Sequence, residues 1–262
     1  MSLNLWTTAY GGAGSTPFHP SSLFSSGEKG ALYMPWMPGS LWQDTAGTIP
    51  AGHGDTVGRM TDWSGNGSHA TQATSASRPI VNVASGVTSV VGDAIDDQLR
   101  TASINLSHTS NVTIVASLSQ GAEIGRMIAE FGTTFTGAGA WYLSSEAGMT
   151  CNVGGGGGYR ARNTGAITNV RRILSGRYSR SGAHPDIKLD GASIAGTTNG
   201  SGTIAGAFGA YPLALLSRWN GSAITLPSNA ALSAFLLIDR ALTDDELIAT
   251  EAYFAAQTGV TF

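Results

Sequence analysis

The clearest pattern of apolar and polar positions lies near the C-terminal end of the chain. Phe235–Ile238 is a continuous apolar run, which is typical of a strand covered on both faces. After a short connection, Thr243 and Glu246 have the spacing of a capping box, and Gly259 provides a stop. The pattern predicts a buried strand followed by a capped helix. The apolar positions with helical spacing are Leu247, Ile248, Ala252, Phe254 and Ala255.

The other apolar runs are short and are separated by Gly, Asn, Asp or Pro. Asn111–Leu118 is rich in β-branched residues and predicts a strand, and Asp186–Ile194 predicts a hairpin that turns at Asp190 and Gly191. With one helix and roughly ten to thirteen strands, the pattern predicts an all-β, two-sheet antiparallel sandwich. Further strands are expected at Ile80–Val83, Val87–Val91, Arg126–Phe131, Gly139–Leu143, Arg171–Tyr178, Ile204–Phe208 and Leu213–Leu216.

Residues 1–40 differ from the remainder because they combine Gly, Pro and aromatic residues without a strand or helix period. We expect an extended N-terminal arm over 1–40 and a sandwich domain over 41–262. The arm either wraps the sandwich or attaches it to a larger assembly. Its expected anchors are Trp6, Tyr10, Phe18 and Phe24.

Composition narrows the class of protein. In the 262 residues, 42% are apolar, 12% are charged and 36 are Gly, which indicates a turn-rich folded chain rather than a disordered one. The net charge of −3 gives no electrostatic footprint for nucleic acid. Cys151 is the only cysteine, so no intrachain disulfide can form. No signal peptide and no membrane span are expected, so we expect folding in a cytoplasm.

Three segments together resemble the concanavalin A-like, laminin-G-like (LamG) jelly-roll family. They are the loop Asp62–Ala70, the hairpin Ile187–Gly191 and the closing segment Phe235–Glu246. The resemblance implies that the closing segment is a strand of the sandwich followed by a loop and a short helix.

Gly92–Leu99 resembles that family's Phe-Asp-Gly-Val-Asp-Asp-Tyr-Leu stretch, but it departs from it at Ala94 and Gln98. A narrower resemblance is to LamG-type proteins encoded by tailed bacteriophages. The segments that carry it are Phe24–Tyr33, Leu41–Thr48 and Asn66–Pro79.

The enzyme hypothesis depends on paired carboxylates. Sandwich hydrolases similar to this fold supply both from one strand, as Glu-x-Asp-x-x-Glu or Glu-x-Asp-x-Glu, and none of the glutamates here sits in that pattern. Asp96 and Asp97 are adjacent, so on a strand they would point to opposite faces. We therefore expect no catalytic residues, and a polysaccharide depolymerase on the same fold is the alternative.

No cofactor is expected, apart from the ion that the family resemblance brings into question. Calcium is the commonest ion of that family, and Asp62, Asp96 and Asp97 are the residues that would contribute oxygens. Asx residues also favour turns for local reasons. The tract Gly154–Gly158 lacks the Lys-Ser/Thr of a phosphate loop and is better explained as a hairpin tip.

Carbohydrate binding on a sandwich uses exposed aromatic rings with Asn, Asp and Arg donors and acceptors in the loops. Each aromatic residue can equally be a packing residue. The candidates for glycan binding are Trp63, Asn66, His69, Trp141, Tyr211, Trp219 and Asn220.

The phage-like resemblance leads to a non-enzymatic virion protein, a capsid decoration, head fibre or tail protein that would bind host-surface polysaccharide. Its expected partners are other virion proteins and further copies of itself, with a trimer favoured. A cellular adhesion module is a third hypothesis. The sequence identifies neither the glycan nor the position on the particle.

Overall fold

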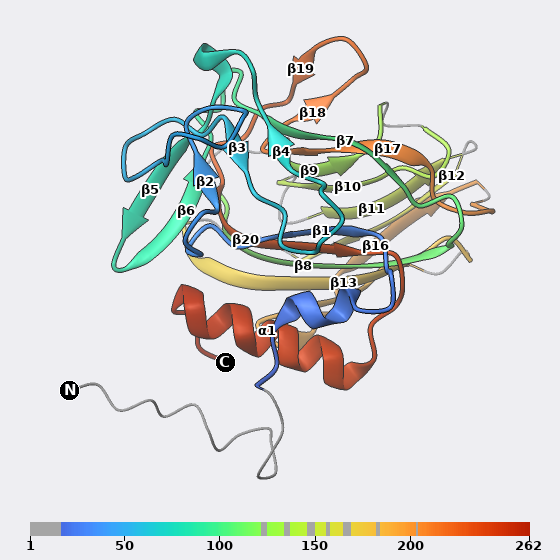
Figure 1. Ribbon diagram of the computed structural model, residues 1–262. Coiled ribbons are helices and arrows are strands. Elements are labelled where there is room, and N and C mark those ends of the chain that lie inside the picture. The colour runs from blue at the N-terminus through green and yellow to red at the C-terminus, as the bar shows by residue number, and fades with distance from the viewer. Residues whose placement is uncertain are drawn as a thin grey trace.

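The computed structural model describes residues 17–121, 125–133, 137–145, 150–155, 158–164, 169–181, 184–202 and 204–262. Within these residues two large antiparallel sheets form a sandwich, and one α-helix follows the last strand. Figure 1 shows three layers, with a ten-stranded sheet above, an eight-stranded sheet below it, and the helix beneath both. The all-β, two-sheet fold expected from the sequence is confirmed.

The eight-stranded sheet contains the longest strands of the described chain. Its eight strands are β1 (Gly30–Tyr33), β5 (Ile80–Ala84), β6 (Val87–Val91), β8 (Asn111–Ser119), β13 (Arg171–Ser179), β14 (Asp186–Leu189), β15 (Ala192–Ser193) and β20 (Ala231–Ile238), of which β8, β13 and β20 are the longest. Their order is β15-β14-β13-β8-β20-β6-β5, and β1 pairs with β20. Asp190 and Gly191 have φ values of 50° and 74°, so the expected hairpin turn between β14 and β15 is confirmed.

The ten-stranded sheet is built from shorter strands. They are β2 (Leu41–Trp42), β3 (Arg59–Met60), β4 (Ala70–Thr71), β7 (Leu99–Asn105), β9 (Met127–Phe131), β10 (Trp141–Ser144), β11 (Thr150–Gly155), β12 (Gly158–Asn163), β16 (Thr197–Ser201) and β17 (Ala210–Leu215). Their order is β16-β12-β11-β10-β9-β17-β7-β4-β3-β2. The strands β18 (Arg218–Trp219) and β19 (Ile224–Thr225) form a separate hairpin, which lies above β7 and β17 in Figure 1.

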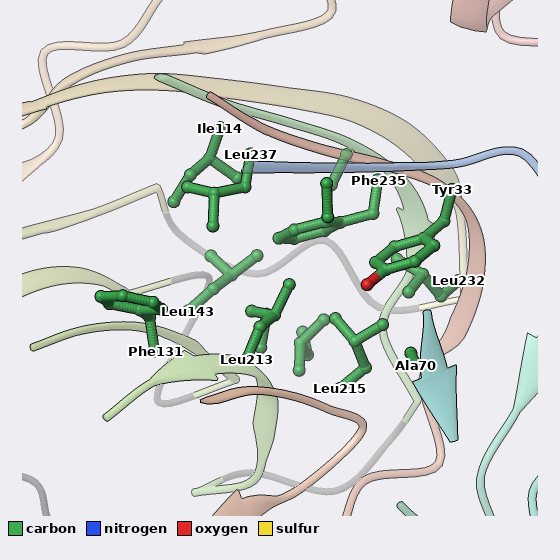
Figure 2. Close-up of a cluster of buried hydrophobic side chains, with 14 of the residues drawn as sticks. Tyr33, Ala70, Ile114, Phe131, Leu143, Leu213, Leu215, Leu232, Phe235 and Leu237 are labelled. Carbon is green, nitrogen blue, oxygen red and sulfur yellow. The ribbon is translucent and has the colours of Figure 1, made fainter. Parts of the chain in front are cut away.

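The main hydrophobic core lies between the two sheets. Figure 2 shows Phe235 and Leu237 of the eight-stranded sheet facing Leu143 and Leu213 of the ten-stranded sheet. Trp141 is fully buried there, with its ring stacked on those of Phe131 and Phe235 at centroid distances of 6.1 and 6.4 Å. Stacked rings of this size dominate the burial of apolar area in a core.

The helix α1 (Asp244–Thr258) covers the outer face of the eight-stranded sheet and forms a second core with β1, β8 and β20. Its expected capping box is confirmed, because the Thr243 hydroxyl accepts the Glu246 N–H and the Glu246 carboxylate accepts the Thr243 N–H. Gly259 ends the helix in the left-handed conformation. No helix in the described residues is long and apolar enough to span a membrane.

Residues 17–40, which we expected to belong to an attachment arm, are part of the sandwich. The 3₁₀ helix η1 (Pro20–Phe24) packs under α1, and β1 pairs with β20 along its whole length. Phe24 is buried and the half-buried Phe18 packs against the same second core, so both residues anchor this segment to the sandwich itself. This corrects their expected role. Trp6 and Tyr10 lie outside the described residues.

The strand expected at Ile204–Phe208 is wrong. Ile204 and Phe208 are buried, but the backbone there is irregular, and the strand of this region is β16, whose residues are all exposed. The apolar pattern therefore indicated burial, and it did not indicate backbone pairing. A second 3₁₀ turn, η2 (Ser75–Ser77), precedes β5.

The first residue of β1 provides a sharp test of the pairing with β20. A Cβ added at Gly30 would lie 1.9 Å from the Leu237 carbonyl oxygen, and φ is +146°. We predict that Gly30→Ala lowers the free energy of unfolding by about 3 kcal/mol in urea titrations. Gly52→Ala is the matched control, because its added Cβ would meet only Asp55 Oδ2 at 3.7 Å. Equal losses in both variants would contradict this packing.

Candidate functional site

One row of side chains crosses the outer face of the ten-stranded sheet, the face turned away from the core. Directly paired residues of an antiparallel sheet point to the same face. Tyr142 pairs with Glu130, Glu130 with Ala214, and Ala214 with Arg100. Their chain neighbours, including Phe131 and Trp141, point into the core, so this row points outward. The row continues through Thr71, Arg59 and Trp42.

The β18–β19 hairpin is fixed to this row by a buried ion pair. Arg218 Nε donates to both oxygens of Glu130 at 3.0 and 2.8 Å, and the Glu130 side chain is only 1% exposed. Burial raises the pKa of the Glu130 carboxyl, while the hydrogen bond and charge of Arg218 lower it. The Arg218 guanidinium also lies 5.7 Å from the centre of the Tyr142 ring.

The same hairpin places an aromatic ring on a second cation of the row. The Arg100 guanidinium carbon lies 3.7 Å from the centre of the Trp219 ring, a cation–π contact. The Arg100 side chain makes no hydrogen bond or ion pair with the described residues, and its Nη1 is buried without a partner. Burial lowers the pKa of Arg100. Trp219 and Arg100 are both half-buried, so this pair lies at the surface of the hairpin.

Asn220 shapes the hairpin that carries Trp219. Its side-chain oxygen accepts the N–H groups of Ser222 and Ala223 at 3.0 and 2.8 Å, and also the Ser222 hydroxyl. Such an Asx turn reverses the chain. Trp219 and Asn220 are two of the expected glycan residues. Trp219 presents a ring at the surface, and Asn220 stabilises the turn of the hairpin.

The expected calcium candidate Asp62 is occupied by its own loop. One oxygen accepts the N–H groups of Leu32 and Ser64, both at 2.9 Å. The other accepts the Ser64 hydroxyl at 2.7 Å and the Ser68 N–H at 2.8 Å. Both oxygens of this buried carboxylate are used to join the loop to β1, so Asp62 is corrected to a structural residue.

The three glycan candidates in that loop also make structural contacts. Trp63 donates from Nε1 to the Ser40 hydroxyl at 2.8 Å and packs against the second core. Asn66 donates from its amide to the Glu28 carbonyl at 3.0 Å, and His69 Nδ1 accepts the N–H of residue 62 at 3.1 Å. Burial lowers the pKa of His69. The loop at residues 62–70 is hydrogen-bonded to residues 28, 32 and 40, which are distant in sequence, and these bonds explain its residue pattern without a ligand.

The other two aromatic candidates face inward. Trp141 is fully buried in the core, where no sugar can contact its ring, so that expectation is corrected. The Tyr211 hydroxyl donates to the Ala138 carbonyl at 2.8 Å, and its ring edge contacts Phe131. Of the four aromatic candidates Trp63, Trp141, Tyr211 and Trp219, only Trp219 joins the outer row of the ten-stranded sheet within the described residues.

An acidic loop precedes β7. Oxygens of Asp93, Asp96 and Asp97 lie within 4.8 Å of one another, and Asp62 is not among them. Burial and then the charges of Asp93 and Asp96 raise the pKa of Asp97 to about 6. Three carboxylates suit the oxygen preference of calcium but supply only part of its six to eight ligands. Calcium binding at Asp96 and Asp97 stays a prediction. Asp93 belongs to the same cluster, but the sequence analysis did not name it as a candidate.

Hydrogen bonds within the acidic loop already use one oxygen of each carboxylate. Asp97 accepts the Asp93 N–H at 2.9 Å, Asp93 accepts the Ile95 N–H at 2.7 Å, and Asp96 accepts the Ser77 hydroxyl at 2.8 Å. These bonds organise the loop by themselves, so the cluster does not by itself indicate a bound ion.

A hollow of about 530 Å³ lies at the β16 edge of the ten-stranded sheet, away from the hairpin. It is lined by Arg160, His184 and residues 198–202. Arg160 donates to the carbonyls of Tyr159 and Ser201 at 2.7 and 3.2 Å. The lining has no Phe, Tyr or Trp ring, and its one guanidinium is engaged by backbone oxygens, so the outer row is the better candidate site.

The ion pair beneath the hairpin generates a stability prediction. Arg218→Met leaves Glu130 buried without its partner, and we expect a loss of about 3 kcal/mol in the free energy of unfolding. The double variant Glu130→Gln/Arg218→Met should recover a substantial part of that loss in urea titrations. Arg172→Met, which removes an ion pair whose arginine side chain is 40% exposed, is the control and should cost less, about 1 kcal/mol.

Asp97 generates a pH prediction. A carboxyl whose pKa rises on folding binds more protons in the native state, so it reduces stability as the pH rises through about 4 to 6. Asp97→Asn, which keeps an acceptor for the Asp93 N–H, should therefore stabilise the protein at about pH 7.5 and change little at about pH 4. Urea titrations in buffers with a chelator measure this.

Asp44 serves as a control because its pKa is shifted in the opposite direction from that of Asp97. Hydrogen bonds from the Thr48 hydroxyl and from the backbone of Ile49 and Thr48 lower its pKa to about 2. Asp44→Asn should destabilise at neutral pH, and the difference should vanish as the pH falls towards 2. A wild-type-like pH profile for Asp97→Asn would show that the Asp97 carboxyl is not perturbed as described.

No protein-family model matches this sequence, and no curated protein sequence matches it. Among solved structures, the chain is similar to botulinum neurotoxin type C, whose cell entry depends on two ganglioside molecules, with a TM-score of 0.53 and 8% identity over 87% of this chain and 51% of that one. It is also similar to a receptor-binding domain, with a TM-score of 0.54 and 9% identity over 90% of this chain and 53% of that one.

A Trypanosoma rangeli sialidase is similar with a TM-score of 0.51 and 12% identity over 90% of this chain and 34% of that one. The chain thus spans about a third to a half of these three proteins. At these identities the likeness shows the β-sandwich fold alone. Because the three include both an enzyme and binding proteins, the fold does not decide between catalysis and binding.

Proposed function

We propose that this chain is a non-enzymatic carbohydrate-binding sandwich whose site is the outer row of the ten-stranded sheet beneath the β18–β19 hairpin. The observation that carries the proposal is the Trp219 ring, held at the surface on Arg100 at 3.7 Å. Proteins of similar fold bind gangliosides or act on sialosides, which supports a saccharide as the ligand.

The physical basis is the pairing of an apolar ring with fixed polar groups. An aromatic face packs against the C–H groups of a sugar ring, and adjacent donors orient its hydroxyls. Trp219 supplies the ring, and Arg100 supplies N–H donors beside it. The buried pair Glu130–Arg218 and the Asn220 turn hold the hairpin, so little ordering would be needed on binding.

The carboxylates of this face favour binding over hydrolysis. Glycosidases place two carboxyl groups about 5–5.5 Å or 6.5–9.5 Å apart. Among the described residues of the outer row, Glu130 is the only carboxylate, and it is buried and paired with Arg218. A polysaccharide depolymerase is the competing function, and it would need a second carboxylate within reach of this face.

The setting that we propose is the particle of a tailed bacteriophage, as capsid decoration, head fibre or tail protein. The support is the series of phage-like motifs in the sequence, including Leu41–Thr48 and Asn66–Pro79. The partners would be other virion proteins and further copies of the chain, with a trimer favoured and with Trp6 and Tyr10 as attachment residues. Mass spectrometry of purified particles tests this, and particles without the polypeptide would end the virion proposal.

The glycan-binding proposal is tested by Trp219→Ala on immobilised host-surface polysaccharides. We expect at least a tenfold loss of affinity, equivalent to about 1.4 kcal/mol, because the stacking surface is removed. Phe262→Ala is the control, because Phe262 is 59% exposed and lies beside the β14–β15 turn of the other sheet. Binding that survives Trp219→Ala would contradict the site.

Release of reducing sugar decides between the two functions. The wild-type chain should release none from the polysaccharides that it binds. Release that disappears in a folded Glu130→Gln variant would replace the binding proposal with a hydrolase.

A further inference from the structure

Arg100 differs from Arg59 of the same row and from Arg218 of the β18–β19 hairpin because no acceptor satisfies its side chain. Arg218 is neutralised by Glu130, and Arg59 donates to the Ala46 carbonyl at 2.9 Å. The Arg100 side chain makes a cation–π contact with the Trp219 ring, and its Nη1 is buried without a hydrogen-bond partner among the described residues. A guanidinium stays charged in proteins and is costly to remove from water without an acceptor.

We infer that the site binds an acidic saccharide, and that Arg100 pairs with a carboxylate of the sugar beside Trp219. This inference rests on the proposed function, since it names the class of glycan that the same face would take. It commits to a carboxylated sugar, such as a uronic or nonulosonic acid, rather than to a neutral or sulfated one.

The geometry of the pair suits a planar anion. The Arg100 guanidinium carbon lies 3.7 Å from the centre of the Trp219 ring. Nη1 is the buried atom of this guanidinium, whereas Nε and Nη2 are neither buried nor hydrogen-bonded to the described residues, so this edge is the one open to a ligand. Two parallel N–H donors match the two oxygens of a carboxylate, an arrangement that the point charge of a lysine does not reproduce. A sugar whose carboxylate meets Arg100 would bring its ring to the hairpin that carries Trp219.

The charge balance of the row points to the same class. Among the described residues, the charged groups of the row are Arg59, Arg100 and Glu130, and Glu130 is already paired with Arg218 of the hairpin. The acidic loop at residues 93–97 precedes β7, but none of its carboxylates forms an ion pair with Arg100. The face therefore carries unpaired positive charge that an anionic ligand would neutralise.

The experiment titrates the full chain against a panel of sialylated, uronic-acid, sulfated and neutral oligosaccharides. We expect carboxylated members to bind at least about tenfold more tightly than neutral ones, with an affinity that falls as salt rises. Arg100→Gln should reduce them to the neutral level, and Arg100→Lys should restore only part of the loss. Thermal unfolding confirms that each variant is folded.

Lys29→Gln is the matched control, because it removes the same charge from an exposed side chain before β1, on the other sheet. Its affinities should equal those of the wild type. Neutral or sulfated glycans that bind as tightly as carboxylated ones, or carboxylate binding that survives Arg100→Gln, would overturn the inference. Neutral binding that Trp219→Ala abolishes would leave the proposed function standing, and no binding to any member would overturn both.

Discussion

The stacking of Trp141 between Phe131 and Phe235 is the contact on which the structure depends. It joins the two sheets through fully buried rings, with centroid distances of 6.1 and 6.4 Å. Since side chains alternate along a strand, fixing Phe131 and Trp141 inward obliges Glu130 and Tyr142 to point outward. The core therefore determines which side chains reach the outer face, and a shift of one residue would bury the polar ones.

The Glu130 carboxylate points away from the core but is buried, so it needs a charged partner. This requirement determines where the β18–β19 hairpin packs. Glu130 is covered by Arg218, which brings β18 onto the sheet and carries Trp219 over Arg100. The main effect of the buried pair is to fix the position of the hairpin on the sheet, since replacing such a pair by apolar groups is often neutral for stability. The exposed site thus follows from a buried interaction one residue earlier in the chain.

The sequence is informative where a local rule acts. The capping box at Thr243, the hairpin turn at Asp190 and the β-branched strand at residues 111–118 follow from short-range chemistry, and the structure confirms them. The candidate site is harder to predict from the sequence, because the pairing of Glu130 with Ala214 and of Ala214 with Arg100 joins segments that are far apart in the chain. No local pattern encodes that register.

The burial of individual aromatic residues is equally hard to predict from the sequence. The residues that flank Trp141 and Trp219 do not reveal that the first is fully buried and the second half-buried over a cation. The loop at residues 62–70 is recognisable because of its Asp, Asn and Gly residues, but these serve the hydrogen bonds of Asp62. A polar, Gly-rich loop with a Trp predicts a turn more securely than it predicts a ligand.

A crystal structure of the chain with a bound carboxylated oligosaccharide tests the central claim most directly. We predict a sugar ring within about 4 Å of Trp219, with its carboxylate on the guanidinium of Arg100. A sugar seated instead in the hollow lined by Arg160 and His184, with Trp219 free of contact, would contradict it.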